Sequence, residues 1–387
     1  MDYTVEGVAS ERPFRIARLG HTGWSSIDLL GTIDFLRRRL GLMVSDAVTF
    51  PNMPETIAPD LAKAYFVRCA SDHHTLVLAS REAHLTRAPA DSPMVGQLSW
   101  QVGTLRQVSD GIDYLKDRAV LGRLGRDCPG SNWHVYFSDP DGYTNELFYG
   151  MEQIGWDGRS KPVSMYDRGF RERFTLPQIA EEAEVERAAA RGDVFDGWRD
   201  PIDGAATFDL GGVIAERPFR VTRLGRMLLD VRDLEASVRF YVDVLGLRET
   251  ERRSVDGHTC VSLRAGEEHH SLVLCERGLF AGLGFRAAAG LAVPDYGQLL
   301  AARDALTAEG LEIVELPPAL SAGISYGFWV KGPDEMGFQL FTGMQRVERD
   351  GSAPQPSASP PPLATWPERL PAGERGWYEP PFLGPLA

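Results

Sequence analysis

The sequence predicts an α+β fold in which one domain is duplicated and each copy forms curved, mostly antiparallel sheets. The first observation is an internal repeat, because segments of the first half recur in the same order in the second half. The second is the order of the predicted elements, in which a strand is followed by a helix and then by several strands. The repeated pairs are ERPFRIARLG (Glu11–Gly20) with ERPFRVTRLG (Glu216–Gly225), DHHTLVLAS (Asp72–Ser80) with EHHSLVLCE (Glu268–Glu276), and DPDGYTNELFYGM (Asp139–Met151) with GPDEMGFQLFTGM (Gly332–Met344).

Each copy contains segments whose apolar residues recur at helical spacing. In the second copy a strand at Leu228–Val231 precedes a helix at Leu234–Leu245, which Gly246 ends. The counterpart in the first copy carries apolar residues up to Leu40 and ends at Gly41. This order favours antiparallel sheets over a doubly wound parallel sheet. Further helices are predicted at Leu105–Leu115, after a strand at Leu98–Val102, and from Tyr296 to Gly310.

The end of the first copy is typical of two strands joined by a tight turn. Trp133–Phe137 is aromatic and β-branched, and Asp139–Gly142 has the Asp, Pro and Gly residues that a reversal needs. The run Asn145–Tyr149 is apolar except for Glu146 and its neighbour Asn145. A carboxylate buried in such a strand costs free energy unless it is paired or holds a cation. Glu146 is therefore the first candidate functional residue.

The repeat predicts four parts of the chain. Two domains at residues 1–150 and 213–346 are separated by a polar linker, 151–212, with a surface helix around Gln178–Arg191. The remainder, 347–387, is a Pro-rich tail that cannot form a sheet or a long helix. Its terminal aromatic residues suggest that the end of the tail docks on protein surface, although a mobile tail fits the composition equally well. These aromatic residues are Trp377, Tyr378 and Phe382.

Composition excludes several classes of function. With a net charge of −13, the chain lacks the basic balance of a nucleic-acid-binding protein. No apolar run reaches the roughly 18 residues of a membrane span, and the first residues do not resemble a signal peptide. The four cysteines show no Cys-x-x-Cys spacing, which indicates neither a zinc knuckle nor a disulfide framework. We therefore expect a cytoplasmic protein with no nucleic-acid or membrane partner.

Several motifs of the first half resemble those of a known superfamily. They are LGHTGW with His21, DHHTLVL with His73 and His74, GR followed by PGSN within Gly125–Asn132, and YFSDPDGYTNE ending at Glu146. In these motifs the chain resembles the vicinal oxygen chelate superfamily (the glyoxalase, bleomycin resistance and dioxygenase group), and within it the type I extradiol ring-cleaving dioxygenases. The resemblance implies paired βαβββ modules around a cavity. It also implies a metal held by His21, Gln97 and Glu146.

Physical chemistry supports a metal at these positions. Two histidines and one carboxylate on one face of a site leave positions open on Fe(II), where a chelating substrate and O2 can both bind. A hydrogen-bonded core histidine is the alternative for His21. Gln97 stands where the ring-cleaving enzymes have their second metal histidine, and Asp127 stands where they have a histidine that handles bound oxygen. An amide oxygen is a weaker ligand than imidazole, so iron should be held less tightly.

Other residues match catalytic positions of the family. His74 matches the acid/base histidine that takes a proton from a bound diol. A structural histidine is the alternative, and the repeat weakens the catalytic interpretation because His270 occupies the same position in the second copy. Tyr136 matches a substrate-binding tyrosine, and plain aromatic core is the alternative. His134 lies two residues before Tyr136 and shares its face of the strand. Our hypothesis is that His134 takes over part of the oxygen-handling role that the family's histidine has at the position of Asp127.

The second copy is an internal control. The positions equivalent to His21, Gln97 and Glu146 are Arg226, Ala288 and Gln339, and Trp329 replaces Tyr136. Such a set offers no ordinary ligands for a divalent ion. The second domain is therefore expected to serve as a lid, a dimerisation surface or a partner that shares the core, which favours a homo-oligomer.

The sequence thus predicts a metal-dependent extradiol-type dioxygenase that acts on a small aromatic or catechol-like substrate and O2. Fe(II) is the favoured ion, with Mn(II), Zn(II) or Ni(II) as alternatives. A second hypothesis is a glyoxalase-type isomerase or lyase that uses the ion as a Lewis acid. A third is a non-catalytic protein that sequesters a ligand. No Gly-x-Ser-x-Gly segment or phosphate-binding glycine loop supports hydrolase or nucleotide chemistry.

Overall fold

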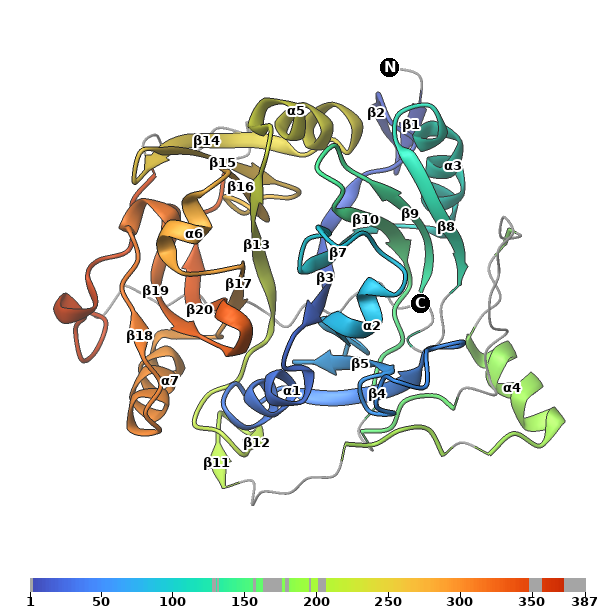
Figure 1. The fold of residues 1–387 in the computed structure, drawn as a ribbon, viewed down its shortest axis with the longest axis horizontal. Coiled ribbons are helices and arrows are strands. Elements are labelled where there is room, and N and C mark those ends of the chain that lie inside the picture. The colour runs from blue at the N-terminus through green and yellow to red at the C-terminus, as the bar shows by residue number, and fades with distance from the viewer. Residues whose placement is uncertain are drawn as a thin grey trace. The chain divides into compact units, whose positions relative to one another are not determined.

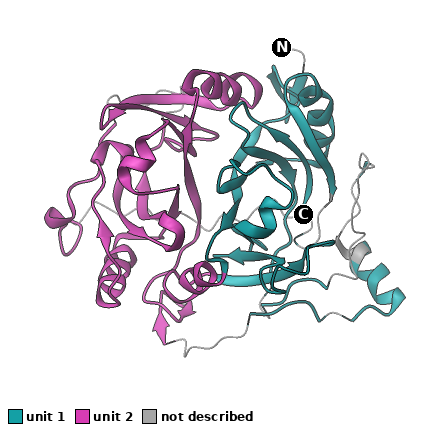
Figure 2. Cartoon of the chain, in the orientation of Figure 1, with its two compact units in different colours: residues 1–29, 43–201, 383–387 teal, residues 30–42, 202–382 magenta. Residues whose placement is uncertain are grey.

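A computed structural model describes residues 3–126, 130, 132–155, 158–162, 176–177, 181–194, 196–200, 207–347 and 357–371. By contacts, the chain divides into two compact units (Figure 2). Unit 1 contains the described residues of 1–29 and 43–201, and unit 2 those of 30–42 and 202–382. Each unit is built around one mixed eight-stranded sheet, most of whose strands are labelled in Figure 1.

The sheet of unit 1 has the strand order β4-β5-β6-β3-β7-β10-β9-β8. Neighbouring strands are antiparallel except for the parallel pairs β3–β6 and β7–β10. Strands β3, β7 and β10 lie in its middle, and most of their side chains are buried. The strands are β3 (Ile16–Ser26), β4 (Met43–Thr49), β5 (Lys63–Arg68), β6 (Leu76–Ser80), β7 (Val95–Val102), β8 (Val120–Arg126), β9 (Trp133–Ser138) and β10 (Thr144–Tyr149).

The sheet of unit 2 repeats this topology in the order β14-β15-β16-β13-β17-β20-β19-β18. Its parallel pairs, β13–β16 and β17–β20, occupy the equivalent places. The predicted α+β fold with a duplicated domain and mostly antiparallel sheets is therefore confirmed. The strands are β13 (Arg223–Val231), β14 (Arg248–Val255), β15 (His258–Arg264), β16 (Leu272–Glu276), β17 (Ala287–Ala292), β18 (Ile313–Val314), β19 (Ile324–Lys331) and β20 (Met336–Met344).

Strand register makes the two copies comparable residue by residue. In unit 1, Ser99 of β7 lies opposite both His21 of β3 and Glu146 of β10. In unit 2, Gly290 of β17 lies opposite both Arg226 of β13 and Gln339 of β20. His21 therefore corresponds to Arg226, and Glu146 to Gln339, as the sequence repeat predicted.

The predicted helices form, with small differences at their ends. The segment predicted as one helix from Leu234 is α5 followed by a π-helical turn at Phe240–Val244. Apolar residues of α3, including Leu105, Val108 and Leu115, are buried as the spacing predicted. The helices are α1 (Leu29–Arg38), α2 (Arg81–Leu85), α3 (Leu105–Lys116), α4 (Glu181–Arg191), α5 (Leu234–Arg239), α6 (Leu279–Leu283) and α7 (Tyr296–Ala308), and short hairpins are formed by β1 (Tyr3–Val5) with β2 (Val8–Ser10) and by β11 (Phe208–Asp209) with β12 (Ile214–Ala215).

Helix α1 belongs by contacts to unit 2, although the repeat places it in the first copy. Phe35 stacks on Phe338 with 5.6 Å between ring centroids. Just beyond the helix, Arg39 Nη1 lies 2.8 Å from Glu309 Oε2. The contact-based units and the domains predicted from the repeat therefore divide the chain differently at this helix.

The described part of the tail, residues 357–371, docks on unit 2. Trp366 is 9% exposed, and its ring contacts the rings of Tyr296, Tyr326 and Phe328. Tyr296 donates a hydrogen bond from its hydroxyl to the Pro367 carbonyl at 2.6 Å. The tail thus packs through a tryptophan that the sequence analysis did not single out. The aromatic residues predicted to dock, Trp377, Tyr378 and Phe382, lie outside the described residues.

Replacing Trp366 by Ala should release the tail from unit 2. Removal of a buried tryptophan costs roughly 3 kcal/mol of packing, and it removes the ring contacts with Tyr296, Tyr326 and Phe328. We expect rapid proteolytic cleavage near residue 366 while the rest of unit 2 stays resistant. Limited proteolysis with mass spectrometry measures this. The exposed Glu368→Ala is the control, and equal cleavage of both variants would contradict the packing role.

Among the described residues, no helix combines the length and apolar character needed to cross a bilayer.

Candidate metal centre

Three predicted ligand side chains meet in the middle of the unit 1 sheet. Glu146 on β10 is fully buried, and its Oε2 lies 2.9 Å from Nε2 of His21 on β3. The amide nitrogen of Gln97 on β7 is 2.8 Å from Glu146 Oε2 and 3.2 Å from His21 Nε2. The strand alternation separates the two polar residues of β10, because Asn145 points to the other face and accepts from Trp100 Nε1 at 2.8 Å.

Further polar groups hold the other oxygen of the Glu146 carboxylate. Asn132 donates to Oε1 at 3.1 Å, and Nδ1 of His134 lies 3.5 Å from the same oxygen. Burial acts to raise the pKa of Glu146, but the neighbouring His21 and His134 imidazoles lower it to about 2. The side chain is therefore a carboxylate at neutral pH. It is a buried negative charge that a cation would compensate.

The spacing of the three donor groups fits a divalent ion. First-row metals bind such ligands at about 2.0–2.2 Å, so adjacent ligand atoms of an octahedral site are about 3 Å apart. The triangle formed by His21 Nε2, Glu146 Oε2 and the Gln97 amide has edges of 2.8, 2.9 and 3.2 Å. The oxygen and nitrogen of an amide exchange places by a half-turn of the side chain, so Gln97 can offer either atom. Ser99 Oγ accepts from the amide nitrogen at 2.8 Å.

No group of three or more His, Cys, Asp or Glu side chains with metal-binding geometry occurs in the described part of the chain. The centre at His21 and Glu146 falls outside that definition because its third member is an amide. The imidazole Nδ1 of His21 is buried and accepts or donates no hydrogen bond among the described residues. His21 is thus oriented from one side only, through Glu146.

The predicted catalytic side chains surround this centre. The ring centroid of His74 lies 4.3 Å from that of His21, and burial together with the neighbouring His21 and His73 lowers the pKa of His74 well below its usual value. His134 is fully buried, and its ring lies 4.5 Å from the half-buried ring of Tyr136. His134 and Tyr136 therefore share a face, as their spacing predicted. Asp127 lies outside the described residues.

Gly130 packs closely against the side chains of His73 and His74. Its φ is +95°, and a Cβ added there would lie 3.0 Å from His74 Cε1 and 3.1 Å from His73 Nδ1. We expect Gly130→Ala to destabilise the protein by roughly 2–3 kcal/mol, through backbone strain and displacement of the histidines.

Gly142→Ala provides a matched control for this effect. Gly142 has φ +87°, but nothing lies within 4 Å of an added Cβ. Gly142→Ala should therefore lower the free energy of unfolding by only about 1 kcal/mol, the cost of placing alanine at a positive φ. Chemical denaturation measures both variants, and equal losses would contradict the contact with the histidine pair.

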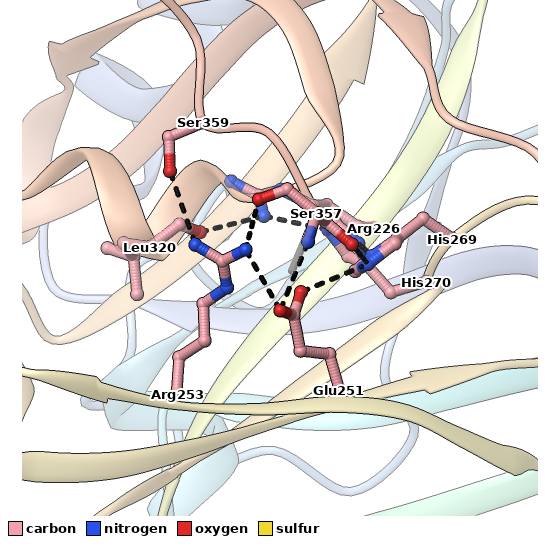
Figure 3. A network of polar contacts seen from close by, with 8 residues as sticks. All are labelled: Arg226, Glu251, Arg253, His269, His270, Leu320, Ser357 and Ser359. Atoms are coloured by element: carbon pink, nitrogen blue, oxygen red, sulfur yellow. Dashed lines mark hydrogen bonds and ion pairs between the residues drawn. The ribbon is translucent and has the colours of Figure 1, made fainter. Parts of the chain in front are cut away.

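Unit 2 places a guanidinium where unit 1 would hold the ion. Arg226 is fully buried, and its Nη2 donates to Gln339 Oε1 at 2.5 Å. Its Nη1 contacts His270 Nε2 at 2.8 Å and the Leu320 carbonyl at 3.0 Å (Figure 3). Burial lowers the pKa of Arg226 to about 9, so it remains a cation at neutral pH. Ala288 offers no donor atom. The second copy therefore has a cation of its own.

The sequence analysis missed two groups that complete the centre. Asn132 was noted only as part of PGSN, yet it binds the carboxylate directly. Ser99 binds the Gln97 amide. Ser99 could have been found, because it lies two residues after Gln97 and so on the same face of a strand. Asn132 precedes β9, and outside a strand the spacing of residues does not predict the direction of a side chain. A pocket of about 480 Å³ lined by residues of 104–106 and 176–177 includes none of the candidate residues.

Comparison with known proteins identifies relatives of the fold and of the sequence. A sequence profile of the Glyoxalase/Bleomycin resistance protein/Dioxygenase superfamily matches residues 18–147 and 223–340, well over half of the 387 residues. A 2,2',3-trihydroxybiphenyl dioxygenase of Sphingomonas paucimobilis is 28% identical over 162 residues, which are 41% of this chain and 50% of that protein. The match thus spans only half of the relative's length.

Solved structures share the fold at low identity. The 2,3-dioxygenase LapB of Pseudomonas sp. KL28 superposes with a TM-score of 0.56 at 16% identity, covering 88% of this chain and 96% of that one. A Mn(II)-bound glyoxalase of Novosphingobium aromaticivorans gives 0.54 at 12% identity, covering 89% of each chain. The 2,2',3-trihydroxybiphenyl 1,2-dioxygenase of Sphingomonas wittichii strain RW1 gives 0.51 at 15% identity, covering 92% and 100%. At these identities the likeness concerns the fold.

Proposed function

The chain belongs to the Glyoxalase/Bleomycin resistance protein/Dioxygenase superfamily, and on that premise we propose that it is a metal-dependent extradiol-type dioxygenase with its active site in unit 1. Its substrates are a small aromatic or catechol-like molecule with vicinal oxygens and O2. The observation that carries the proposal is the buried Glu146 carboxylate, 2.9 Å from His21 and 2.8 Å from the Gln97 amide. The sequence similarity to a trihydroxybiphenyl dioxygenase supports the substrate class.

His21, Gln97 and Glu146 would hold the ion, with Fe(II) favoured and Mn(II), Zn(II) or Ni(II) as alternatives. The ion, when bound, supplies open positions at which a chelating substrate and O2 can be brought together. Glu146 contributes the negative charge, and Asn132 fixes the orientation of its carboxylate through the hydrogen bond to Oε1. Burial of both Glu146 and His21 excludes bulk water from the ligand atoms.

The surrounding side chains bind the substrate and move its proton. The imidazole of His74 accepts a proton from a substrate hydroxyl and returns it later in the reaction. The hydroxyl of Tyr136 orients the substrate from β9, where the ring is half-buried. His134 lies between the Tyr136 ring and the Glu146 carboxylate, at 4.5 Å and 3.5 Å respectively. It is placed to donate a hydrogen bond to oxygen beside the centre. Related enzymes use a histidine for this at the position where this chain has Asp127.

A second candidate function is a glyoxalase-type isomerase or lyase. Gln97 favours it, because a neutral amide in place of a second imidazole leaves a bound ion more electron-poor and a stronger Lewis acid. The Mn(II)-bound glyoxalase shares the fold. In this function the ion would polarise a substrate carbonyl, and His74 would move a proton between carbon atoms.

Oxygen uptake separates these functions. Protein purified without oxygen and loaded with Fe(II) is mixed with a panel of catechols and biphenyl diols, and O2 consumption is followed with an electrode. Uptake of one O2 per substrate supports the dioxygenase. Metal binding without uptake, but with conversion of a hemithioacetal, supports the isomerase. If the chain binds neither a divalent ion nor O2 with any diol, a ligand-sequestering protein becomes the better assignment.

The proposal includes a cytoplasmic location and a homo-oligomer. The cysteines of the described residues, Cys69, Cys260 and Cys275, are free thiols, which is typical of a reducing compartment. Analytical ultracentrifugation of the full chain tests the oligomer.

A further inference from the structure

The second copy fixes the position of each proton in a chain of polar side chains. Arg226 Nη1 lies 2.8 Å from Nε2 of His270 (Figure 3). A guanidinium group has only donors, so His270 Nε2 must accept. A neutral imidazole carries its one proton on the other nitrogen, which here is Nδ1. The tautomer of His270 thus follows from geometry alone.

The same reasoning extends to the preceding histidine. His270 Nδ1 lies 2.7 Å from Nδ1 of His269, so His269 accepts there and carries its own proton on Nε2. That proton points to Ser357 Oγ at 2.7 Å and to Glu251 Oε2 at 3.4 Å. Arg253 anchors the carboxylate, with Nη2 2.9 Å from Glu251 Oε1. The chain therefore runs from a carboxylate through two imidazoles to the place that corresponds to the metal centre (Figure 3).

The first copy contains an equivalent but looser arrangement, with Asp46 in the place of Glu251. Asp46 and Glu251 are equivalent, because each directly follows the register shift in the first strand of its sheet, β4 or β14. His73 Nδ1 lies 3.0 Å from His74 Nδ1, and His73 Nε2 lies 3.8 Å from Asp46 Oδ2. Ser160 donates to Asp46 Oδ2 at 3.2 Å. All three members of the chain are buried.

A glycine supports the histidine pair in each copy. Gly130 has φ +95° and lies behind His73 and His74, and Gly323 has φ +80° and lies behind His269. Gly130 O accepts from the backbone N–H of Glu152, and Gly323 O accepts from that of Gln345. The carbonyls of Glu152 and Gln345 in turn accept from the backbone N–H of His73 and His269. The two chains are therefore alike in backbone as well as in side chains.

We propose that Asp46 and His73 are positioning residues that hold His74 in the Nδ1–H form, with the Nε2 lone pair directed toward the His21 side of the centre. At 3.8 Å the Asp46 carboxylate lies beyond a direct hydrogen bond, but its negative charge favours the proton of His73 on Nε2, the nitrogen nearer to it. His73 Nδ1 then accepts from His74 Nδ1, which leaves His74 Nε2 free of a proton. The equivalent atom, His270 Nε2, contacts Arg226, which replaces His21. This inference rests on the proposed function, because it assigns the atom of His74 that would take the substrate proton.

Nitrogen-15 NMR of the full-length chain tests the tautomers directly. The chain has eight histidines, so selective labelling gives few signals, and two-bond ¹⁵N–¹H spectra show which nitrogen of each ring carries the proton. Single His→Gln variants assign the signals. We expect Nδ1–H for His74 and His270 and Nε2–H for His73 and His269, in metal-free protein at neutral pH. A wild-type His74 in the Nε2–H form would overturn the proposal.

Asp46→Asn and Glu251→Gln form a matched pair for the second part of the test. An amide can donate to His73 Nε2, so Asp46→Asn should move His74 toward the Nε2–H form. Glu251→Gln should leave His270 unchanged, because Arg226 still fixes it. If Asp46→Asn leaves the His74 signals in place, the carboxylate does not set the tautomer and the proposal fails.

Kinetics separate positioning from a merely structural role. With the substrate identified by oxygen uptake, Asp46→Asn should lower kcat by roughly 10- to 100-fold while KM stays within about twofold. Asp46→Glu should restore most of kcat and the Nδ1–H signal. Equal falls in kcat for Asp46→Asn and Asp46→Glu would count against the proposal. If the tautomers are as expected but no substrate consumes O2, the proposed function fails and the tautomer assignment stands.

Discussion

His21→Ala and Glu146→Gln should each abolish binding of a divalent ion by the chain. Wild-type protein purified without oxygen is expected to hold about one ion per chain, and each variant to bind more than about 100-fold more weakly. Glu146 supplies the buried charge, with a pKa near 2, and Gln at this position keeps the size of the side chain but removes that charge. His21 supplies the imidazole 2.9 Å from it. Elemental analysis and titration with Fe(II) or Mn(II) measure both quantities.

His258→Ala is the control for these variants. This imidazole lies at the hairpin end of β15 in unit 2, and its Nδ1 is 3.2 Å from the backbone carbonyl of Asp256. The control should retain full metal content. Circular dichroism must show that all variants fold. Wild-type metal content in folded His21→Ala and Glu146→Gln would place the ion elsewhere and refute the centre described above.

His74→Gln should lower kcat by roughly 10²- to 10⁴-fold, the usual contribution of a general acid–base group. Metal content should not change, because the ligand atoms belong to His21, Gln97 and Glu146. KM should change little if His74 acts on the proton rather than on substrate binding. Steady-state oxygen uptake measures kcat and KM, and metal analysis of the same preparation confirms loading.

The repeat supplies the matched control. His270 has the same neighbour, the same burial and the same place in the fold as His74, but it contacts Arg226. His270→Gln keeps an acceptor for that guanidinium and should leave kcat within about twofold. A large loss of kcat in His270→Gln, or none in His74→Gln, would show that the histidine pairs serve the fold rather than the reaction.

The fold could be predicted from the sequence because the same order of segments occurs in both halves of the chain. Repeated segments at Asp72–Ser80 and Glu268–Glu276 became equivalent strands with equivalent histidine pairs. Glu146 could be predicted from a physical argument, since an acid inside an apolar strand needs a partner. His21 and Gln97 followed from the resemblance, and strand pairing then brought them within hydrogen-bonding distance.

Other parts of the site depend on long-range pairing that spacing does not encode. Asp46 lies 3.8 Å from His73, and it is carried on β4, which pairs with β5. Asn132 reaches Glu146 from the segment that precedes β9. The docking of Trp366 required Tyr296 and Tyr326, which come from separate elements of unit 2. The sequence carries no local signal that pairs such residues.

The guanidinium of Arg226 has a consequence for how the two copies lose their structure. A charge that is covalently part of the chain is present at any concentration of free metal, whereas a bound ion stabilises only by mass action. A strong chelator should therefore lower the melting temperature of unit 1 and leave that of unit 2 unchanged, splitting one calorimetric transition into two. Excess Mn(II) should bring them together again. Arg226 makes one half of the molecule independent of the metal supply of its surroundings.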